Sequence, residues 1–170
     1  MQITRQTKLS EILNLGKKCG RKNNCCRYGS GCLVNDDLKN IATFLKISEE
    51  ELIKRYLEEK ELFNKKLLKP KLKKNENKPY GQCIFFDGKG CEIHEVKPLQ
   101  CKVGNCSEYG EELSIWFMLN YVINKEDPES IRQYAAYLKS GGKTISGGEL
   151  EELVPDKERL KKTLSFEKLK

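Results

Sequence analysis

Eight cysteines form two groups in this sequence, and their side chains are the ones best suited to do chemistry. The first group is Cys19-x5-Cys25-Cys26-x5-Cys32 and the second is Cys83-x7-Cys91-x9-Cys101-x4-Cys106. Thiolates are soft donors, so sets of four suit tetrahedral zinc or an iron–sulfur cluster far better than magnesium or calcium, which prefer oxygen. We therefore predict a metal-binding protein that uses all eight cysteines as ligands.

The spacing of the cysteines does not identify the metal. Neither group contains the C-x2-C knuckle of a zinc ribbon or the C-x2-C-x2-C-x3-C run of a bacterial ferredoxin. Zinc and iron–sulfur clusters both stay open, and we favour an iron–sulfur cluster. The neighbouring side chains of Cys25 and Cys26 should diverge from an extended or looped backbone, which predicts that they serve two different centres.

Residues around the cysteines could support such a centre. Nearby cations lower the pKa of a thiol, and those within a few residues of a cysteine are Lys17, Lys18, Arg21, Lys22, Arg27, Lys89, Lys97 and Lys102. Outer-shell hydrogen bonds could be accepted by Asp36, Asp37, Glu92 and Glu95. The only histidine, His94, is expected to be a structural hydrogen-bonding residue, with metal ligation as the alternative. A small buried apolar role is the alternative for individual cysteines, first of all for Cys32 and Cys106.

The length and composition of the chain favour one cytoplasmic domain. The chain has 170 residues and a formal net charge of +7, and that length suits a single domain. It contains neither a run of about 18 apolar residues nor the apolar core of a signal peptide. In a reducing compartment cysteines bind metal more often than they form disulfides. Heat-adapted proteins are an exception, because they can form disulfides inside the cell. This chain shares their Lys- and Glu-rich composition, so disulfides stay open as an alternative.

Apolar periodicity predicts short helices around the cysteine groups. We expect helices over residues 7–15, over 35–45, and from a capping box at Ser48 and Glu51 into the mid-60s. Residues 65–79, with seven lysines and two prolines, read as an exposed linker. The stretches 19–32 and 97–106 are expected to be loops, because glycine, asparagine and proline interrupt them.

The second half of the chain predicts a hairpin followed by helices. Residues 83–86 and 91–94 flank the turn sequence Asp87-Gly88-Lys89-Gly90 and should pair as a hairpin. Residues 111–123 are apolar nearly all round and predict the central buried helix. Asp127-Pro128 predicts the start of the next helix, and a charged amphipathic tail follows Pro155.

We therefore expect a mainly α fold with a small β-hairpin, in which about six helices surround two cysteine-rich loops. A single domain should span residues 1–170, with a cysteine-cluster region at about 16–106 and a helical region at about 111–170.

The order of these features resembles the YkgJ-type cysteine-cluster family. The resemblance rests on KKCG, CCRYGSG, LVNDDLKNIATFLKISEEEL and CIFFDGKGCEIHEVKPLQC, which together cover residues 16–106. It implies a zinc- or iron-chelating domain of a kind that also occurs in flagellin lysine N-methylases. It implies matches to family cysteines for Cys19, Cys25, Cys26, Cys83, Cys91, Cys101 and Cys106.

Two departures from the family pattern concern the first group. Gly16 stands where the family has a further cysteine, and five residues separate Cys19 from Cys25 instead of a closer spacing. Cys32 stands where the family more often has an ordinary residue. We hypothesise that Cys32 replaces the missing ligand and keeps the number of thiols at eight.

Three functions remain open on the sequence. The first is a metal-binding protein that holds zinc or, as we favour, iron–sulfur clusters. The second is an enzyme, or the partner of an enzyme, in S-adenosylmethionine-dependent methyl transfer, as the methylase resemblance implies. The third is a zinc-stabilised RNA- or ribosome-associated module that uses the positive charge. The lysine-rich run at 65–78 contains leucine and proline but none of the aromatic platforms that stack on single strands, so nucleic-acid binding is the weaker expectation.

Overall fold

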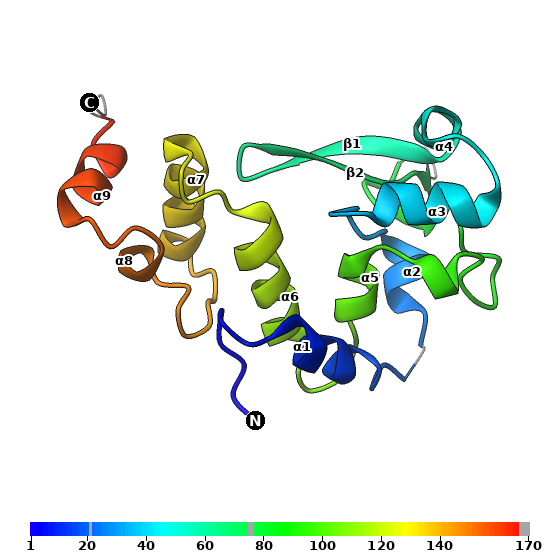
Figure 1. Ribbon diagram of the computed structural model, residues 1–170, viewed down its shortest axis with the longest axis horizontal. Coiled ribbons are helices and arrows are strands. Elements are labelled where there is room, and N and C mark those ends of the chain that lie inside the picture. Colours follow the sequence, from blue (N-terminus) through cyan, green and yellow to red (C-terminus); the bar gives the residue numbers. More distant parts are fainter. Residues whose placement is uncertain (21, 75–76, 167–170) are drawn as a thin grey trace.

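The chain is mainly helical, as predicted. The computed structural model describes residues 1–20, 22–74 and 77–166. Figure 1 shows α7, α8 and α9 at one end of the molecule, the two small sheets and α2 to α5 at the other, and α6 between them. The helices are α1 (Leu9–Gly16), α2 (Asn24–Tyr28), α3 (Asp37–Leu45), α4 (Glu49–Tyr56), α5 (Leu99–Val103), α6 (Gly110–Phe117), α7 (Pro128–Lys139), α8 (Leu150–Leu153) and α9 (Lys157–Leu164).

Two antiparallel sheets of two strands each complete the described structure. Strand β1 (Leu57–Leu62) pairs with β2 (Lys65–Pro70), and β3 (Leu72–Lys74) pairs with β4 (Gly81–Cys83). A 3₁₀ turn, η1 (His94–Val96), precedes α5. A π-helical turn, η2 (Met118–Val122), follows α6. None of the helices in the described ranges has the length and apolar composition needed to cross a bilayer.

Capping signals in the sequence fix several helix starts. The Ser48 hydroxyl accepts a hydrogen bond from the Glu51 amide at 3.0 Å, so the predicted capping box is confirmed in its first half. At the start of α7, the Asp127 carboxylate accepts from the Glu129 amide at 3.0 Å, and Pro128 occupies the first helical position. The predicted central helix is also confirmed, since α6 and η2 bury Trp116 and Phe117.

The predicted continuation of α4 into the mid-60s is wrong. The helix ends at Tyr56, and the chain continues at once as β1, which turns at Phe63 and Asn64 into β2. Both turn residues have positive φ, 48° and 62°, the geometry of a two-residue turn that follows the twist of its strands. The predicted linker is wrong for the same reason, because its residues 65–70 and 72–74 are strands; residues 75 and 76 lie outside the described ranges.

The predicted hairpin at the second cysteine group is corrected in its pairing. Cys83 pairs with Leu72 of β3, and only a single bridge, between Phe86 and Cys91, joins the two segments expected to form strands. The turn itself forms as predicted, with the Asp87 carboxylate accepting from the amides of Lys89 and Gly90. The stretches expected to be loops also contain helix, since α2 lies within 19–32 and α5 within 97–106.

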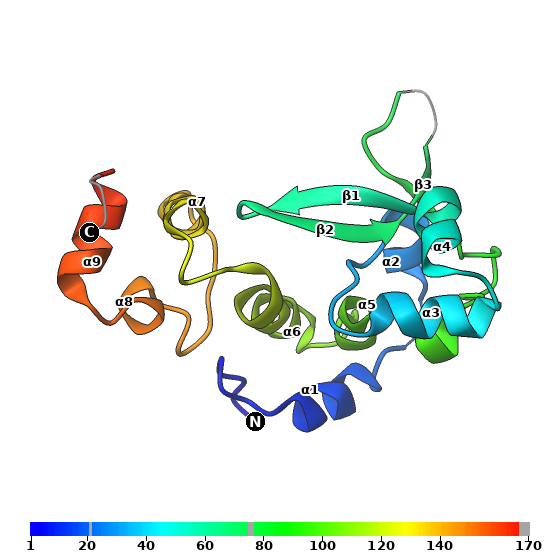
Figure 2. The ribbon, with the colours of Figure 1, turned by 45° about the horizontal axis from the view of Figure 1, so that its top comes forward.

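Buried apolar side chains form two clusters. The larger surrounds α6 and α7 and includes Tyr134, Trp116 and Leu113. The smaller lies under α3, α4 and the second cysteine group and includes Phe85 and Ile93. Figures 1 and 2 both show the β1–β2 hairpin reaching from α4 toward α7. The hairpin therefore connects the two clusters.

Side chains at the tip of this hairpin fix it to the C-terminal helices. The ring of Phe63 packs edge-on against Tyr134 and Tyr137, with centroids 6.1 and 6.0 Å apart. The Asn64 side-chain amide donates to the Asp127 carboxylate at 2.8 Å, and the Lys65 ammonium donates to the Tyr121 carbonyl at 2.7 Å. The lysine-rich segment is thus part of the packed structure, not an exposed tether.

The N-terminal segment packs on the far side of the helical half. Thr4 forms a parallel bridge with Ser146, and the guanidinium of Arg5 donates to the Gly147 carbonyl at 2.7 Å. The Trp116 indole donates to the Thr7 carbonyl at 3.0 Å. Residues 4–7 are therefore held by residues more than 100 positions away in the sequence.

Candidate metal centre

Helix α2 presents two thiols side by side. The sulfur atoms of Cys25 and Cys26 lie 3.9 Å apart. The expectation that they diverge is wrong, because the backbone here is a helical turn and not an extended loop. Two thiolates that share a tetrahedral metal with bonds of about 2.3 Å stand about 3.8 Å apart. The pair therefore already has the spacing of two ligands of one ion.

Three further thiols accept hydrogen bonds from backbone amides. The sulfur of Cys83 accepts from the Phe85 amide, and the sulfur of Cys91 accepts from the Ile93 amide. The sulfur of Cys101, in α5, accepts from the amide of Gly31, which comes from the first cysteine group. Amide donors directed at sulfur stabilise the thiolate form and tune metal centres that thiolates hold.

Electrostatics connect these three thiols with the pair on α2. We call the set of Cys25, Cys26, Cys83, Cys91 and Cys101 the five-thiol group. The pKa of Cys101 is raised to about 12, mainly by burial, and the charges of Cys83, Cys25 and Cys91 contribute in the same direction. The pKa of Cys26 is raised because its thiol hydrogen-bonds to Cys25, with contributions from burial and from the charges of Cys91 and Cys101. Without a cation, the charges of neighbouring thiolates thus oppose the ionisation of Cys26, Cys83, Cys91 and Cys101.

Two lysines counteract this repulsion, and the first, Lys69, lowers the pKa of Cys83. The ammonium of Lys97 lowers the pKa of both Cys25 and Cys91. The pKa of Cys25 falls to about 6, first because it accepts the hydrogen bond of Cys26. A bound metal cation would act in the same direction on the whole five-thiol group, because thiolates are the ligating form.

Three contacts hold α2 against the second cysteine group. The Asn23 amide donates to the Lys89 carbonyl at 3.1 Å. The Arg27 guanidinium lies 5.5 Å from the centre of the Phe86 ring. The Tyr28 ring meets Tyr80 edge-on at 5.8 Å. Because a five-residue helix is not stable alone, these contacts are what position Cys25 and Cys26.

Two side chains fix α5, and with it Cys101, against the first cysteine group. The buried Asp37 carboxylate accepts from the amides of Val34 and Leu99, both at 2.9 Å, and so caps the start of α5. The Gln100 side chain accepts from the Cys32 amide at 2.6 Å. The sequence suggested Asp37 as an outer-shell acceptor, whereas nothing in it singled out Gln100.

Gly31 is a site residue that sequence reasoning missed. A Cβ atom at this position would lie 2.5 Å from the Cys101 sulfur and 3.1 Å from the Cys101 amide nitrogen. Only glycine lets the backbone approach the thiol this closely. Its place in a Tyr-Gly-Ser-Gly sequence gave a general sign of a turn but no sign of its contact with sulfur.

The other three predicted ligands lie elsewhere. Cys32 is 3% exposed and belongs to the larger apolar cluster, where Lys69 and Lys60 are the charges that act on it. Cys106 is exposed beyond the end of α5. Cys19 is half-buried just after α1 and donates its amide to the Gly16 carbonyl at 3.2 Å. All eight cysteines are free thiols.

The five-thiol group is an open arrangement and not a closed cage. Within the described residues, no three Cys, His, Asp or Glu side chains converge closely enough to hold an ion as they stand. His94 is exposed in η1, three residues after Cys91. The donor type fits zinc or iron, and closing the group around a metal would require the thiols of α2 and of the second cysteine group to move together.

The missing family cysteine has a steric explanation. Gly16 ends α1 against α5, and any Cβ atom there would collide with the carbonyl oxygen of Lys102. A cysteine at this position would require α1 and α5 to separate. This chain therefore packs two helices at the position where the resemblance led us to expect a further cysteine.

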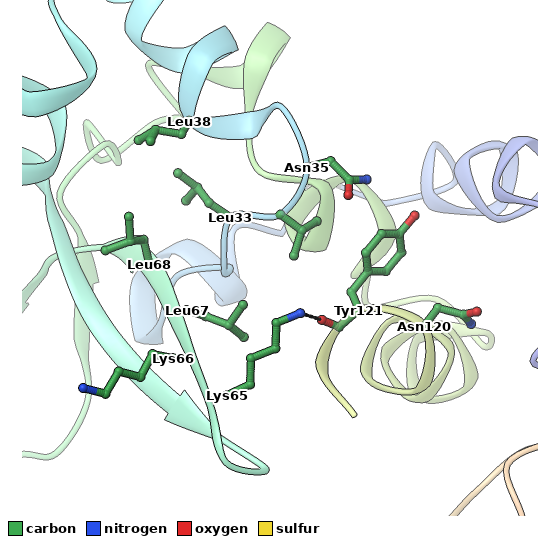
Figure 3. A pocket seen from close by; sticks show the side chains of 10 residues that line it. Leu33, Asn35, Leu38, Lys65, Lys66, Leu67, Leu68, Asn120 and Tyr121 are labelled. Carbon is green, nitrogen blue, oxygen red and sulfur yellow. Dashed lines mark hydrogen bonds between the residues drawn. The ribbon is translucent and has the colours of Figure 1, made fainter. Parts of the chain in front are cut away.

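Two cavities lie away from the five-thiol group. One of about 530 Å³ lies between the loop before α3, strand β2 and η2; Figure 3 shows Leu33, Leu67 and Leu68 on one side and Tyr121 with Asn120 on the other. The second, of about 430 Å³, lies between α6 and the end of α7. Neither cavity is lined by a cysteine.

Comparison with known proteins agrees with the chemistry of the site. No curated protein matches the chain, and no solved structure does. A family model does match, over residues 17–127, which is more than half of the chain; the family is described as "Putative zinc- or iron-chelating domain". The matched stretch includes the whole five-thiol group and ends just after η2. The chain therefore belongs to the CxxCxxCC family of zinc- or iron-chelating domains.

Proposed function

We propose that this protein binds its metal through the five-thiol group, with Cys83, Cys91 and Cys101 as three ligands and one member of the Cys25–Cys26 pair as the fourth. The observation that carries the proposal is the electrostatic coupling of thiols from three separate segments, together with backbone amides that lower the pKa of Cys83, Cys91 and Cys101. Such donors stabilise thiolates at a metal centre. The membership in a chelating family supports the same conclusion.

We propose an iron–sulfur cluster as the form of the metal. No three of the described thiols lie close enough together to hold one ion directly. A cluster fills the space between its ligands with its own iron and sulfide, so it accepts thiolates that are more widely spaced. Zinc is the alternative, and the 3.9 Å separation within the pair is the feature that favours it.

Anaerobic purification followed by elemental analysis and absorption spectroscopy tests the proposal. We expect brown protein with broad visible absorbance and with iron and acid-labile sulfide in stoichiometric amounts. Colourless protein with one zinc per chain would show that the metal is zinc and would leave the proposed ligand set unchanged. Protein without either metal after anaerobic reconstitution would contradict the proposal itself.

Cysteine variants test the ligand set. Cys101→Ser should lose most of the bound metal, because Cys101 is the only thiol that α5 contributes to the group. Either Cys25→Ser or Cys26→Ser alone should retain a centre, whereas the double variant should lose it. Cys32→Ser is the matched control, since Cys32 lies in the apolar cluster, and full metal content in this variant would also remove the hypothesis that Cys32 replaces the missing family ligand.

A further inference from the structure

Two stretches that are far apart in sequence form one exposed surface beside the five-thiol group. Helix α2 packs on β4, and this contact brings the end of α2 to the residue that precedes β4. Tyr28 and Tyr80 meet there with their rings edge-on, at 5.8 Å and 72°. They remain 60% and 43% exposed. Large aromatic rings stabilise a fold when they are buried in its core. A pair of such rings that stays exposed is therefore typical of a binding surface.

Cations surround this aromatic pair. Lys78 places its ammonium 5.7 Å from the centre of the Tyr80 ring. In the β3–β4 register, Lys74 is opposite Gly81, the residue that follows Tyr80, and Lys73 is opposite Gln82. Lys73, Lys74 and Lys78 are all exposed.

The surface has no carboxylate among the residues that the structure describes in 22–31 and 71–81. The one acidic residue that the sequence has in these two stretches, Glu76, lies outside the described ranges. Elsewhere the chain mixes both signs, as in the Glu58–Lys69 ion pair on the β1–β2 hairpin. A local excess of positive charge around exposed aromatic rings is therefore specific to this surface.

We propose that this basic aromatic surface, formed by Tyr28, Lys73, Lys74, Lys78 and Tyr80, binds single-stranded nucleic acid. Aromatic faces stack on unpaired bases, and lysine and arginine side chains neutralise the phosphates that connect them. The net charge of +7 favours the same partner. A lysine-rich segment without aromatic residues made this function a weak expectation on the sequence. The fold supplies the missing platform by pairing Tyr80 with Tyr28.

An acidic protein surface is the competing partner, and the aromatic pair distinguishes the two. Carboxylates on a protein would be bound by the cations alone, whereas unpaired bases also need the ring faces. The inference does not rest on the identity of the metal, because the contacts that form the surface involve no thiol.

Fluorescence anisotropy with a labelled oligouridylate of about 12 nucleotides tests the proposal. The protein as purified should bind this probe at physiological salt with a dissociation constant below about 100 µM, the weak limit of non-specific binding. Tyr28→Ala and Tyr80→Ala should each weaken binding by about fivefold or more, while Tyr28→Phe and Tyr80→Phe retain it. Phe44→Ala is the matched control, because Phe44 is 40% exposed on α3 and lies outside the surface.

Salt dependence and a competitor complete the test. The double variant Lys73→Gln/Lys74→Gln should reduce the slope of log K against log salt by about 1.4, since each phosphate contact on a single strand contributes about 0.7. Polyglutamate should compete far less well than unlabelled oligouridylate.

Three results would overturn the proposal: no binding by the wild-type protein, equal binding by the tyrosine-to-alanine variants, or equal competition by polyglutamate, which indicates an acidic protein partner. Metal content measured on each variant separates this test from the proposed metal site. A tyrosine-to-alanine variant that no longer binds the probe but keeps its metal supports the proposed surface. If a variant loses both probe binding and metal, the tyrosine-to-phenylalanine variants distinguish the two causes.

Discussion

Individual thiols of the five-thiol group differ in their environments even where they are neighbours in sequence. Cys25 is exposed and its pKa is lowered to about 6, whereas the pKa of Cys26, beside it, is raised. The residue types alone predicted a soft metal site, because thiol chemistry belongs to the side chain. Which thiols converge could not be predicted, since that depends on contacts such as that of Gly31 with Cys101, which join residues 70 positions apart.

In metal-free, reduced protein, Cys25 should be the first thiol of the pair to react with iodoacetamide. The thiolate is the reactive form, so its rate should rise through a midpoint near pH 6, while Cys26 stays protonated well above that pH. In Cys26→Ala the Cys25 midpoint should return toward the ordinary value of 9.0. Mass-spectrometric peptide fragmentation measures both rates; equal rates for the two thiols, or an unchanged midpoint in the variant, would contradict this assignment.

Gly31→Ala should weaken metal binding by about tenfold or more, the range found when outer-shell partners of a metal ligand are removed. The added methyl group would displace the Cys101 sulfur, because the Cβ atom of residue 31 would lie only 2.5 Å from it. Competition with a chromophoric chelator measures the affinity. Gly20→Ala is the matched control because its Cβ atom meets nothing within 4 Å. Equal affinities for the two variants would refute the role of Gly31.

The sequence predicted the helices and strands well only where short-range interactions determine them. The starts of α4 and α7 were predicted because their caps are short-range hydrogen bonds. The β1–β2 hairpin was missed because its pairs are cross-strand: Glu58 bonds to Lys69 at 2.9 Å, and Lys60 is paired with Leu67. Charged residues with long side chains are compatible with helix, linker or edge strand, and only the tertiary partner decides between them.

Phe63→Ala should lower the free energy of unfolding by about 1–3 kcal/mol, because the hairpin tip loses its aromatic contacts with α7. Urea denaturation followed by circular dichroism measures the change. Phe44→Ala removes a 40% exposed ring and should change stability by no more than about 0.5 kcal/mol. Similar losses in the two variants would show that the tip does not bind the C-terminal helices.

Asp37→Ala should cost about 2–4 kcal/mol, because it leaves the amides of Val34 and Leu99 without their acceptor. Asp36→Ala, at an exposed position one residue earlier, should be nearly neutral. Asp37→Asn retains an acceptor oxygen and should fall between them. Thermal unfolding of the three variants checks this order, and an Asp37→Ala protein as stable as Asp36→Ala would exclude Asp37 as the cap of α5.

The whole molecule contains two apolar clusters with different sources of stability. The larger is built from long apolar helices, and its composition was predicted from periodicity. The smaller lies under short elements, among them the five-residue helix α2, which local propensity does not support. Such segments depend on side-chain bridges and, under the proposed function, on the metal. This is why the helical half was predicted more completely than the cysteine-rich half.

Removal of the metal should therefore loosen one part of the molecule more than the other. In hydrogen-exchange mass spectrometry, amides of α2 and of residues 83–103 should exchange at least about tenfold faster in metal-free protein. Amides of α6 and α7 should change little, since their contacts lie in the larger cluster. A uniform change along the chain would show that the metal stabilises the molecule as one unit.

The bridge between Thr4 and Ser146 bears on the order in which a newly made chain can fold. Every sulfur of the five-thiol group has been synthesised once translation has passed residue 101. Thr4 must instead wait for a partner that is made some forty residues later. Metal capture can thus precede closure of the amino-terminal strand, so that a loaded site becomes the template on which the helical half is completed.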